Sequence, residues 1–423
     1  MTVPVAVPVL RNKTFLILWG GQTISVLGDT LFTLALMWWV VSATQSGVAV
    51  SLVVLATSLP QLILGSMIGV YIDRADRRKM MLVAATLNGI ITALLALFYW
   101  YGLFSLPLVL FMAVLMSIVT TFDGPAFEAS VPVVVGKEEL VRANSMMHMG
   151  NSAMSIVAPA VSGLLIALAG VGAAIFVNAL TFFVAAISLL FIQFPSPCIA
   201  AGNDKKNSFM HDFVGGLKFV LGHKVLLPLL SYNALLNLAL APVSVALPLL
   251  VLNVWQGGPA LLGLVGSFKA VGFLGAAMLL SAAPGIIKKT GPVIIGSVVA
   301  LGLFTMVVAF APHQGWLLAG VAMVGFVLVM TNVAAQTIWQ REVPDELRGR
   351  AFTARETTTS GLRPLGQAVS GPLLNMVGPV VLIGGAGLLC AIGGVFGLLL
   401  PSVLHYPHEK RTAQSEAPAV SDD

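Results

Sequence analysis

The sequence predicts an all-α integral membrane protein with twelve transmembrane helices, arranged as two six-helix bundles related by a pseudo-two-fold axis. Three observations predict this fold. Hydrophobic residues make up 58% of the 423 residues and charged residues only 9%, a balance that water-soluble domains do not have. The apolar stretches reach about 20 residues, the length that crosses a bilayer core. Lys and Arg are confined to alternate connections, and the two halves share short sequence repeats.

We place the twelve helices at residues 15–41, 48–71, 80–101, 107–128, 144–169, 172–194, 225–251, 260–282, 292–311, 315–339, 352–376 and 380–401. The connections after the odd-numbered helices contain no Lys or Arg: 42–47, 102–106, 170–171, 252–259, 312–314 and 377–379. Of the 22 Lys and Arg residues, only Lys269, Arg355 and Arg363 lie within or at the edge of a predicted helix. Because cytoplasmic loops collect Lys and Arg, we expect both termini to be cytoplasmic and the protein to lie in the inner (plasma) membrane.

The composition and the missing motifs exclude several functions. The net charge of +5 is explained by bases facing anionic lipid headgroups, so no nucleic-acid partner is expected. Cys198 and Cys390 are far apart in the sequence, which argues against a disulfide or a metal cluster. The chain has no phosphate-binding Gly-x-x-x-x-Gly-Lys-Ser/Thr loop and no hydrolase motif. We therefore expect neither an enzyme nor a bound cofactor, only a proton gradient as the energy source.

The chain divides into four regions. Residues 1–194 form the N-terminal bundle, 195–224 a cytoplasmic linker, 225–401 the C-terminal bundle, and 402–423 a polar tail that we expect to be disordered. Within the linker, residues 209–224 have apolar side chains on one helical face. This pattern predicts an amphipathic helix on the inner membrane surface.

The two halves also repeat one another. Ala-Val-Ser-Gly at residues 160–163 recurs 208 residues later at 368–371, and the segment 139–143 resembles 346–351 with one residue inserted. The repeats lie in corresponding loops and helices of the two halves, which indicates duplication. In proteins built from parallel repeats, the substrate site lies at the repeat interface near the bilayer midplane.

The connection between the second and third helices carries a specific motif, Gly-Val-Tyr-Ile-Asp-Arg-Ala-Asp-Arg-Arg-Lys at residues 69–79. Gly69 allows a close helix approach, and Asp73 supplies a negative charge for a helix N-terminus or an Arg of the other half. Arg74, Arg77 and Arg78 suit lipid phosphates. The alternative is a plain basic inner loop.

At these motif positions the chain resembles the major facilitator superfamily, and the resemblance covers all twelve helices. It is most similar to the drug:proton antiporter branch that includes macrolide-efflux proteins and enterobactin exporters. The supporting segments are residues 25–29, 131–144, 343–350 and 364–371. The resemblance implies a rocker-switch fold and export coupled to proton entry. One difference is that the fourth helix carries Asp123 and Glu128 but lacks the Arg found there in many antiporters.

Ionisable residues within membrane helices are costly and usually face protein or water. Asp29 lies about 21 Å along its helix at ~1.5 Å per residue, which suits a group that takes a proton from outside and releases it inside. The alternative is a protonated Asp that bonds a neighbouring helix. Asp123 is a second proton-coupling candidate, beside Pro125, where we expect a break and a hinge. Lys269 needs a carboxylate or a cavity.

The candidates for substrate binding are polar or adaptable residues deep in the spans. Gln22, Asn237 and Gln336 lie in helices that line the cavity in the superfamily, and Lys269 is the basic candidate. Met37 and Met116 are soft and suit promiscuous apolar sites, although packing or lipid contact is the alternative. A further group, Arg355, Glu356 and Arg363, is expected to form an inner-gate ion-pair network with Asp73.

These observations favour a secondary efflux transporter that exports amphipathic, drug-like or macrolide-like molecules in exchange for protons by alternating access. The alternatives are a selective exporter of a native metabolite such as a siderophore, a lysolipid flippase, a facilitator without a coupling ion, and a non-transporting membrane sensor. We expect a monomer whose partners are its substrate, protons and membrane lipids.

Overall fold

The computed structural model describes residues 9–72, 76–136, 138–192, 209–283, 286–287, 289–344, 347–399, 404 and 406. These residues form helices and connections and contain no strand. Ten of the helices are long and apolar enough to cross a membrane. The all-helical membrane fold predicted from the sequence is thus present in the described part of the chain.

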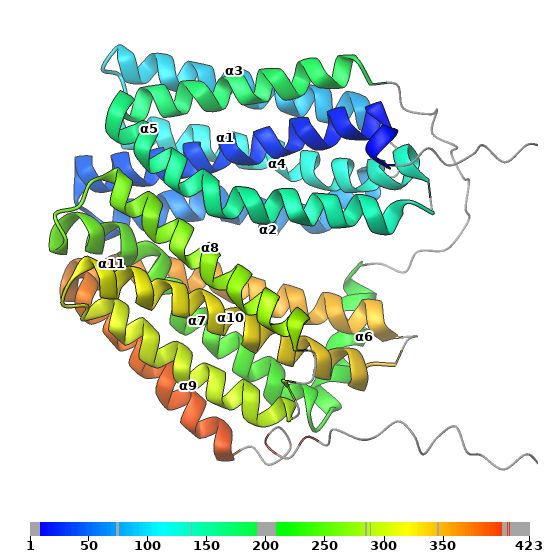
Figure 1. Ribbon diagram of the computed structural model, residues 1–423, viewed down its shortest axis with the longest axis vertical. Coiled ribbons are helices and arrows are strands. Elements are labelled where there is room, and N and C mark those ends of the chain that lie inside the picture. Colours follow the sequence, from blue (N-terminus) through cyan, green and yellow to red (C-terminus); the bar gives the residue numbers. More distant parts are fainter. Residues whose placement is uncertain are drawn as a thin grey trace, which may run out of the picture.

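The helices form two bundles that lie side by side (Figure 1). The first bundle contains α1 (Lys13–Thr44), α2 (Gly47–Ile72), α3 (Arg77–Trp100), α4 (Leu106–Val135) and α5 (Leu140–Leu190). The second contains α7 (Leu226–Leu249) with the π-helical turn η2 (Leu250–Val254), α8 (Pro259–Ala282), α9 (Thr290–Ala309), α10 (Gln314–Glu342) and α11 (Arg348–Phe396). Short helices are η1 (Val9–Arg11), η4 (Gly397–Leu399) and α6 (Phe209–Gly222), which lies where the amphipathic helix was predicted.

Two of the helices, α5 and α11, bend at a glycine. Gly170 has φ 83° and ψ 172°, and Gly378 has φ 77° and ψ 168°, so both lie outside the helical region. A positive φ is readily adopted only by glycine. The segments 140–169 and 171–190, and likewise 348–377 and 379–396, are each about the length of one membrane crossing. The bends fall at the predicted connections 170–171 and 377–379, while the count of twelve spans stays a prediction.

The two bends also extend the internal repeat. Gly378 follows Gly170 by 208 residues, the same offset as the sequence repeat, and the two glycines have nearly the same backbone conformation. Ser162 and Ser370 form another pair at this offset, and each hydroxyl donates to the carbonyl one turn earlier in its helix. The halves therefore share local backbone structure as well as sequence.

The fourth helix differs from its prediction. α4 continues to Val135 and passes through Pro125 and Pro132, and it ends at Gly136, which has φ 77°. The helix therefore ends seven residues beyond the predicted range 107–128, which also contained Pro125, and the hinge expected there stays a prediction.

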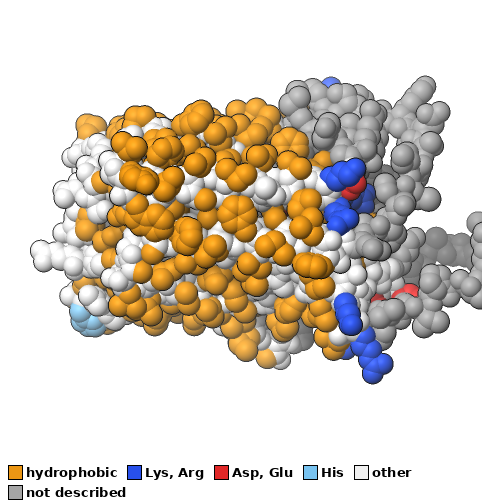
Figure 2. All heavy atoms as spheres, turned by 90° about the horizontal axis from the view of Figure 1, so that it is seen from above, with side chains coloured by type: hydrophobic (Ala, Val, Ile, Leu, Met, Phe, Trp, Pro, Cys, Tyr) orange, Lys and Arg blue, Asp and Glu red, His pale blue; other side chains and the backbone are white. Residues whose placement is uncertain are grey.

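Lys and Arg side chains gather at one end of the molecule, beyond a broad apolar band (Figure 2). We call this the basic end; Lys13 of α1, Arg77 of α3, Lys289 before α9 and Arg348 of α11 mark it. In Figure 1 the two bundles lie close together at the opposite end and diverge toward the basic end. An apolar belt with charge at one end is the pattern of a multi-pass membrane protein.

The apolar cores follow the same division. One core joins the bundles at the end opposite the basic end, combining residues 31–41 of α1, 245–251 of α7 and η2, and 261–265 of α8. At the basic end the described residues form separate cores, one around Phe15 in the first bundle and one around Trp339 in the second. Among the described residues, the apolar core that joins the two bundles therefore lies at the end opposite the basic end.

Two glycine contacts make this packing close. A Cβ on Gly163 of α5 would lie 2.5 Å from the carbonyl oxygen of Pro259 in α8, and a Cβ on Gly371 of α11 would lie 2.6 Å from Ser51 Oγ in α2. Gly163 and Gly371 are equivalent positions of the repeat. The two seams, α5 with α8 and α2 with α11, are therefore related by the same internal symmetry.

Candidate functional site

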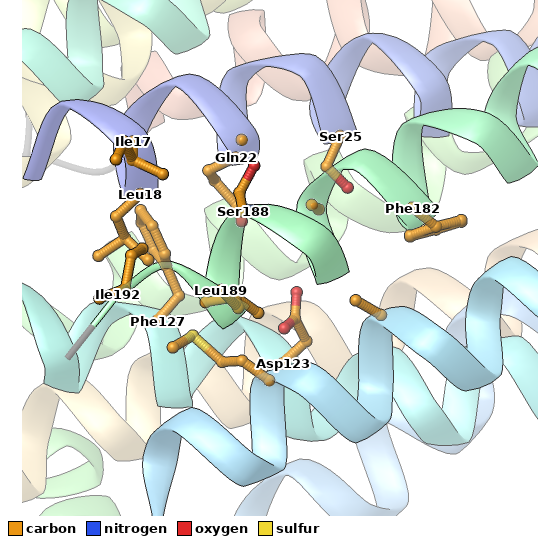
Figure 3. Close-up of a pocket in the computed structure, with 14 residues that line it drawn as sticks. Ile17, Leu18, Gln22, Ser25, Asp123, Phe127, Phe182, Ser188, Leu189 and Ile192 are labelled. Carbon is orange, nitrogen blue, oxygen red and sulfur yellow. The ribbon is translucent and has the colours of Figure 1, made fainter. Parts of the chain in front are cut away.

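A small, mainly apolar cavity that contains four polar side chains lies inside the first bundle, between α1, α3, α4 and α5 (Figure 3). Gln22 and Ser25 come from α1, Asp123 from α4 and Ser188 from α5, and apolar side chains such as Phe127 surround them. The cavity volume is about 30 Å³, which holds a water molecule or two. A drug-sized ligand needs a pocket roughly ten times larger, so this cavity suits water and protons.

Asp29 lies on the face of α1 that carries Ser25 and Gln22, one turn beyond Ser25 and two turns beyond Gln22 as seen from the basic end. Its side chain is accessible to solvent, yet protein surrounds it, and the Asp123 charge acts on it. Of the two predicted proton-coupling residues, Asp123 lines the cavity and Asp29 lies on α1 beyond it, within the field of the Asp123 charge.

The close packing of α1 on α5 fixes Asp29 in this position. Gly28 faces Asn178 and Thr181 of α5, and a Cβ at Gly28 would overlap both side chains, lying 3.1 Å from Thr181 Cβ. Thr181 Oγ1 donates to Asn178 O at 2.8 Å, which holds this part of α5 in a single rotamer arrangement. Gly28, the neighbour of Asp29 in the sequence, therefore determines how closely α1 packs against α5.

Two cations lie at similar depth in the second bundle. Lys269 of α8 and Arg363 of α11 are both solvent-accessible, and the charge of Arg363 acts on Lys269. Lys269 Nζ lies 5.8 Å from the ring centroid of Phe273, one turn along the same helix. The acids act on one another in the first bundle, and the bases act on one another in the second.

Arg355 and Gln336 hold one another near the basic end of the second bundle. Arg355 Nη1 donates to Gln336 Oε1 at 2.5 Å, and its guanidinium lies 5.2 Å from the Trp339 ring and 6.0 Å from the Phe352 ring. Glu356 adds a favourable charge beside Arg355. Gln336, a predicted substrate ligand, is thus engaged by a neighbouring side chain. The expected link to Asp73 stays a prediction, because Asp73 lies outside the described residues.

The motif at residues 69–79 is described only in part. Asp73 and Arg74 lie outside the described residues, and the surroundings of Gly69 are not described. Arg77 Nη1 donates to Ala129 O of α4 at 2.8 Å. Arg78 donates from Nε to Leu189 O at 2.9 Å and from Nη2 to Leu190 O at 2.8 Å, at the end of α5. Cations at helical carbonyl ends stabilise those ends, so these two bases brace the first bundle.

The other predicted substrate ligands are separated by the fold. Met116 is 6% exposed in the apolar core, where its sulfur accepts a hydrogen bond from Thr92 Oγ1 at 3.6 Å. Met37 is partly buried against the same core. Asn237 Nδ2 donates to Asn233 O of its own helix at 3.0 Å. The structure places Met116 away from any accessible surface, while Lys269 is accessible.

Sequence reasoning passed over Ser25 and Ser188, which line the cavity beside Asp123. A single serine in an apolar helix is ordinary in membrane proteins, where its hydroxyl bonds to the backbone. Ser188 does so, donating to Val184 O at 2.8 Å. Its place in the cavity follows from how α5 packs on α1 and α4, and the helical periodicity of α5 alone does not reveal it.

Two helical bundles joined at one end, with accessible ionisable side chains at mid-span and Lys and Arg gathered at the other end (Figure 2), define a membrane transporter of the major facilitator type. Residues 5–419 match the family model described as "Transmembrane secretion effector", and the chain belongs to this family. The resemblance to the major facilitator superfamily is thereby confirmed.

Several curated relatives are efflux proteins by name. Macrolide efflux protein A of Streptococcus pyogenes is 24% identical over 366 residues, which cover 86% of this chain and 90% of the relative. Multidrug efflux pump Tap of Mycobacterium tuberculosis is 27% identical over 379 residues, which cover 87% and 88%.

Solved structures show the same fold. The nucleoside transporter NupG superposes with a TM-score of 0.69 at 12% identity, covering 92% of this chain and 98% of that chain. A bacterial homologue of the iron transporter ferroportin in its inward-facing state gives a TM-score of 0.67 at 16% identity, covering 92% and 99%.

Proposed function

We propose that the protein exports amphipathic small molecules from the cell in exchange for protons, by alternating access. The names of the relatives, macrolide efflux protein A and multidrug efflux pump Tap, support export as the direction. The gathering of Lys and Arg at one end supports an inner-membrane protein with that end, and both termini, in the cytoplasm (Figure 2).

Asp29 carries the proton part of the proposal. It is accessible at mid-span and lies within the field of Asp123. Two nearby carboxylates repel when both are ionised, so uptake of one proton relieves the repulsion. Asp123, Gln22, Ser25 and Ser188 then form a polar track from Asp29 toward the basic end, with room for water. A proton taken up at Asp29 would leave along this track.

The uneven packing of the two bundles supports alternating access. The described contacts between them lie at the end opposite the basic end, where Ser267 Oγ donates to Ile156 O at 2.5 Å and Gly47 N donates to Asn375 Oδ1 at 2.7 Å. At the basic end each bundle has an apolar core of its own, so each bundle stays packed there without the other. Such an arrangement is that of a conformation open to the cytoplasm, and rocking about the glycine seams would open the other side.

The test is transport by everted membrane vesicles that contain the Asp29→Asn variant. We expect the variant to lose pH-driven uptake of a substrate that the wild type transports, because the amide cannot bind the proton. Substrate-exchange transport, which needs no net proton movement, should persist and serve as the folding control. The matched control is Glu128→Gln, which removes an accessible acid of α4. This variant should transport normally. Undiminished pH-driven uptake by Asp29→Asn would remove Asp29 from the proton path.

A further inference from the structure

The cavity in the first bundle gathers side-chain oxygens from three helices. Gln22 and Ser25 lie one turn apart on α1, Ser188 comes from α5 and Asp123 from α4. In Figure 3 the side chains of Ser25, Ser188 and Asp123 reach into the space between these helices. The cavity volume of about 30 Å³ leaves room for water or for a small ion. The chemistry of the four side chains decides which of the two they suit.

Close packing of α1 on α5 holds the Ser188 hydroxyl beside α1. A Cβ on Gly21 would lie 3.7 Å from both Cβ and Oγ of Ser188, an ordinary van der Waals contact. Gly21 precedes Gln22 and lies one turn before Ser25. Ser188 Oγ donates its only proton to Val184 O at 2.8 Å. This hydroxyl can therefore offer the cavity only lone pairs, which suit a positive ligand.

Ser25 is buried without a hydrogen-bond partner among the residues that the structure describes. It is only 6% exposed, and its hydroxyl neither donates nor accepts a hydrogen bond there. Other buried serines of the first bundle, Ser130 and Ser162, donate to the carbonyl one turn earlier in their own helices. A buried hydroxyl without a partner is costly, so Ser25 needs a ligand in the cavity that it lines.

Asp123 likewise has no counter-charge in the described part of the chain. It takes part in no ion pair or hydrogen bond there. Arg77 and Arg78 of α3 donate instead to backbone carbonyls of α4 and α5. The Asp123 charge reaches Asp29, which is another acid. A carboxylate within a membrane protein is costly without a positive partner, and the apolar wall of the cavity strengthens charge interactions inside it.

The four side chains match a small monovalent cation. Their oxygens are hard ligands, which hard cations prefer, and a single carboxylate balances a single positive charge. Ca²⁺ takes about six to eight oxygen ligands, commonly with several carboxylates. No group of three His, Cys, Asp or Glu side chains gathers in the ranges that the structure describes. Water would satisfy the Ser25 hydroxyl and leave the Asp123 charge unbalanced, whereas a cation does both.

We propose that the cavity binds a monovalent cation of the size of Na⁺, held by the Asp123 carboxylate, the Ser25 and Ser188 hydroxyls and the Gln22 amide oxygen. Such a site goes beyond the proposed proton exchange, in which water fills the same space. A bound cation neutralises Asp123 and occupies the path between Asp29 and the basic end. Sodium and the entering proton therefore exclude one another in this cavity.

The experiment measures binding of radioactive Na⁺ by the full-length protein in phosphatidylcholine nanodiscs, with no substrate and no pH gradient. The buffer is held at about pH 8.5, well above the ordinary pKa of a carboxyl group, and choline keeps the ionic strength constant. We expect saturable binding above the background of protein-free nanodiscs, displaced by unlabelled Na⁺ and Li⁺ and not by choline. Absence of saturable binding would overturn the proposal. Displacement by Ca²⁺ at lower concentrations than by Na⁺ would overturn the monovalent assignment.

Two variants with matched controls test the residues. Asp123→Asn should weaken Na⁺ binding roughly 10–100-fold, the range seen when groups that support a metal site are removed. Glu128→Gln, which removes an accessible acid of the same helix, should leave binding unchanged. Ser25→Ala should weaken binding roughly three- to tenfold, the effect of one hydrogen-bonding group. Ser130→Ala removes a buried hydroxyl that bonds to Ala126 O and should leave binding unchanged.

Wild-type Na⁺ affinity in folded Asp123→Asn would overturn the proposal. Should that variant fail to fold, as judged by its elution from a sizing column, the two serine variants decide. Equal Na⁺ affinities for Ser25→Ala and Ser130→Ala would then overturn the site.

The outcome is separable from that of the export proposal, because binding is measured without transport. Saturable Na⁺ binding by a protein that moves no substrate in vesicles would contradict the export proposal alone. Proton-driven export by a protein that binds no Na⁺ would contradict the cation site alone.

Discussion

The seam between α5 and α8 gives a quantitative prediction about the conformational equilibrium. A Cβ on Gly263 would lie 3.0 Å from Gly163 Cα and closer still to the Pro159 carbonyl. Carbon atoms normally approach to about 3.5–4.0 Å, so Gly263→Ala must push the helices apart by roughly 0.5–1 Å. Overpacking of this kind costs about 1–3 kcal/mol. Because the seam is closed in the present conformation, the substitution should disfavour that conformation selectively.

Each 1.4 kcal/mol changes an equilibrium about tenfold, so the population open at the basic end should fall roughly five- to hundredfold relative to the opposite state. Electron–electron double resonance between spin labels at positions 13 and 289, both exposed at the basic end, would follow this equilibrium. We expect a shorter inter-label distance to gain population in Gly263→Ala.

The matched control is Gly275→Ala on the same helix. A Cβ there would lie 3.8 Å from Phe326, an ordinary contact, while the gain in helix propensity from Gly to Ala is the same in both variants. Identical distance distributions for Gly263→Ala and Gly275→Ala would refute the reasoning that this seam is a state-specific contact.

Two further outcomes are expected in the connections at the basic end. Arg78→Gln removes two charge-assisted bonds to Leu189 O and Leu190 O and should lower the free energy of unfolding by about 1–3 kcal/mol, seen as a lower Tm in detergent; a Tm equal to wild type would mean that the bonds are not formed. Burial and the hydrogen bond to Glu342 raise the pKa of Tyr406 above its ordinary value. A raised pKa stabilises the contact fully below about pH 10 and loses it as pH rises further, so the C-terminal tail should become more sensitive to protease only above that pH, and in Tyr406→Phe at every pH.

The sequence predicted the membrane class, the internal repeat and the positions of both bends. Hydropathy and the short connections between apolar stretches are local properties that can be read from the sequence. The offset of 208 residues between Gly163 and Gly371 indicated a duplication, and only the packing shows that these glycines contact the other half. The end of α4 was placed seven residues too early, at 128 instead of Val135, because helix boundaries are the least local part of the pattern.

The candidate site was less predictable. Asp29 and Asp123 were singled out by the cost of burying a charge, which depends on depth along a helix and so is readable from the sequence. Met116 was chosen for its adaptability, yet the direction of a side chain around α4 depends on how α4 packs against α2 and α3. Whether Lys269 and Arg363 are accessible depends on how α8 and α11 pack, and the sequence around them carries no local signal of it.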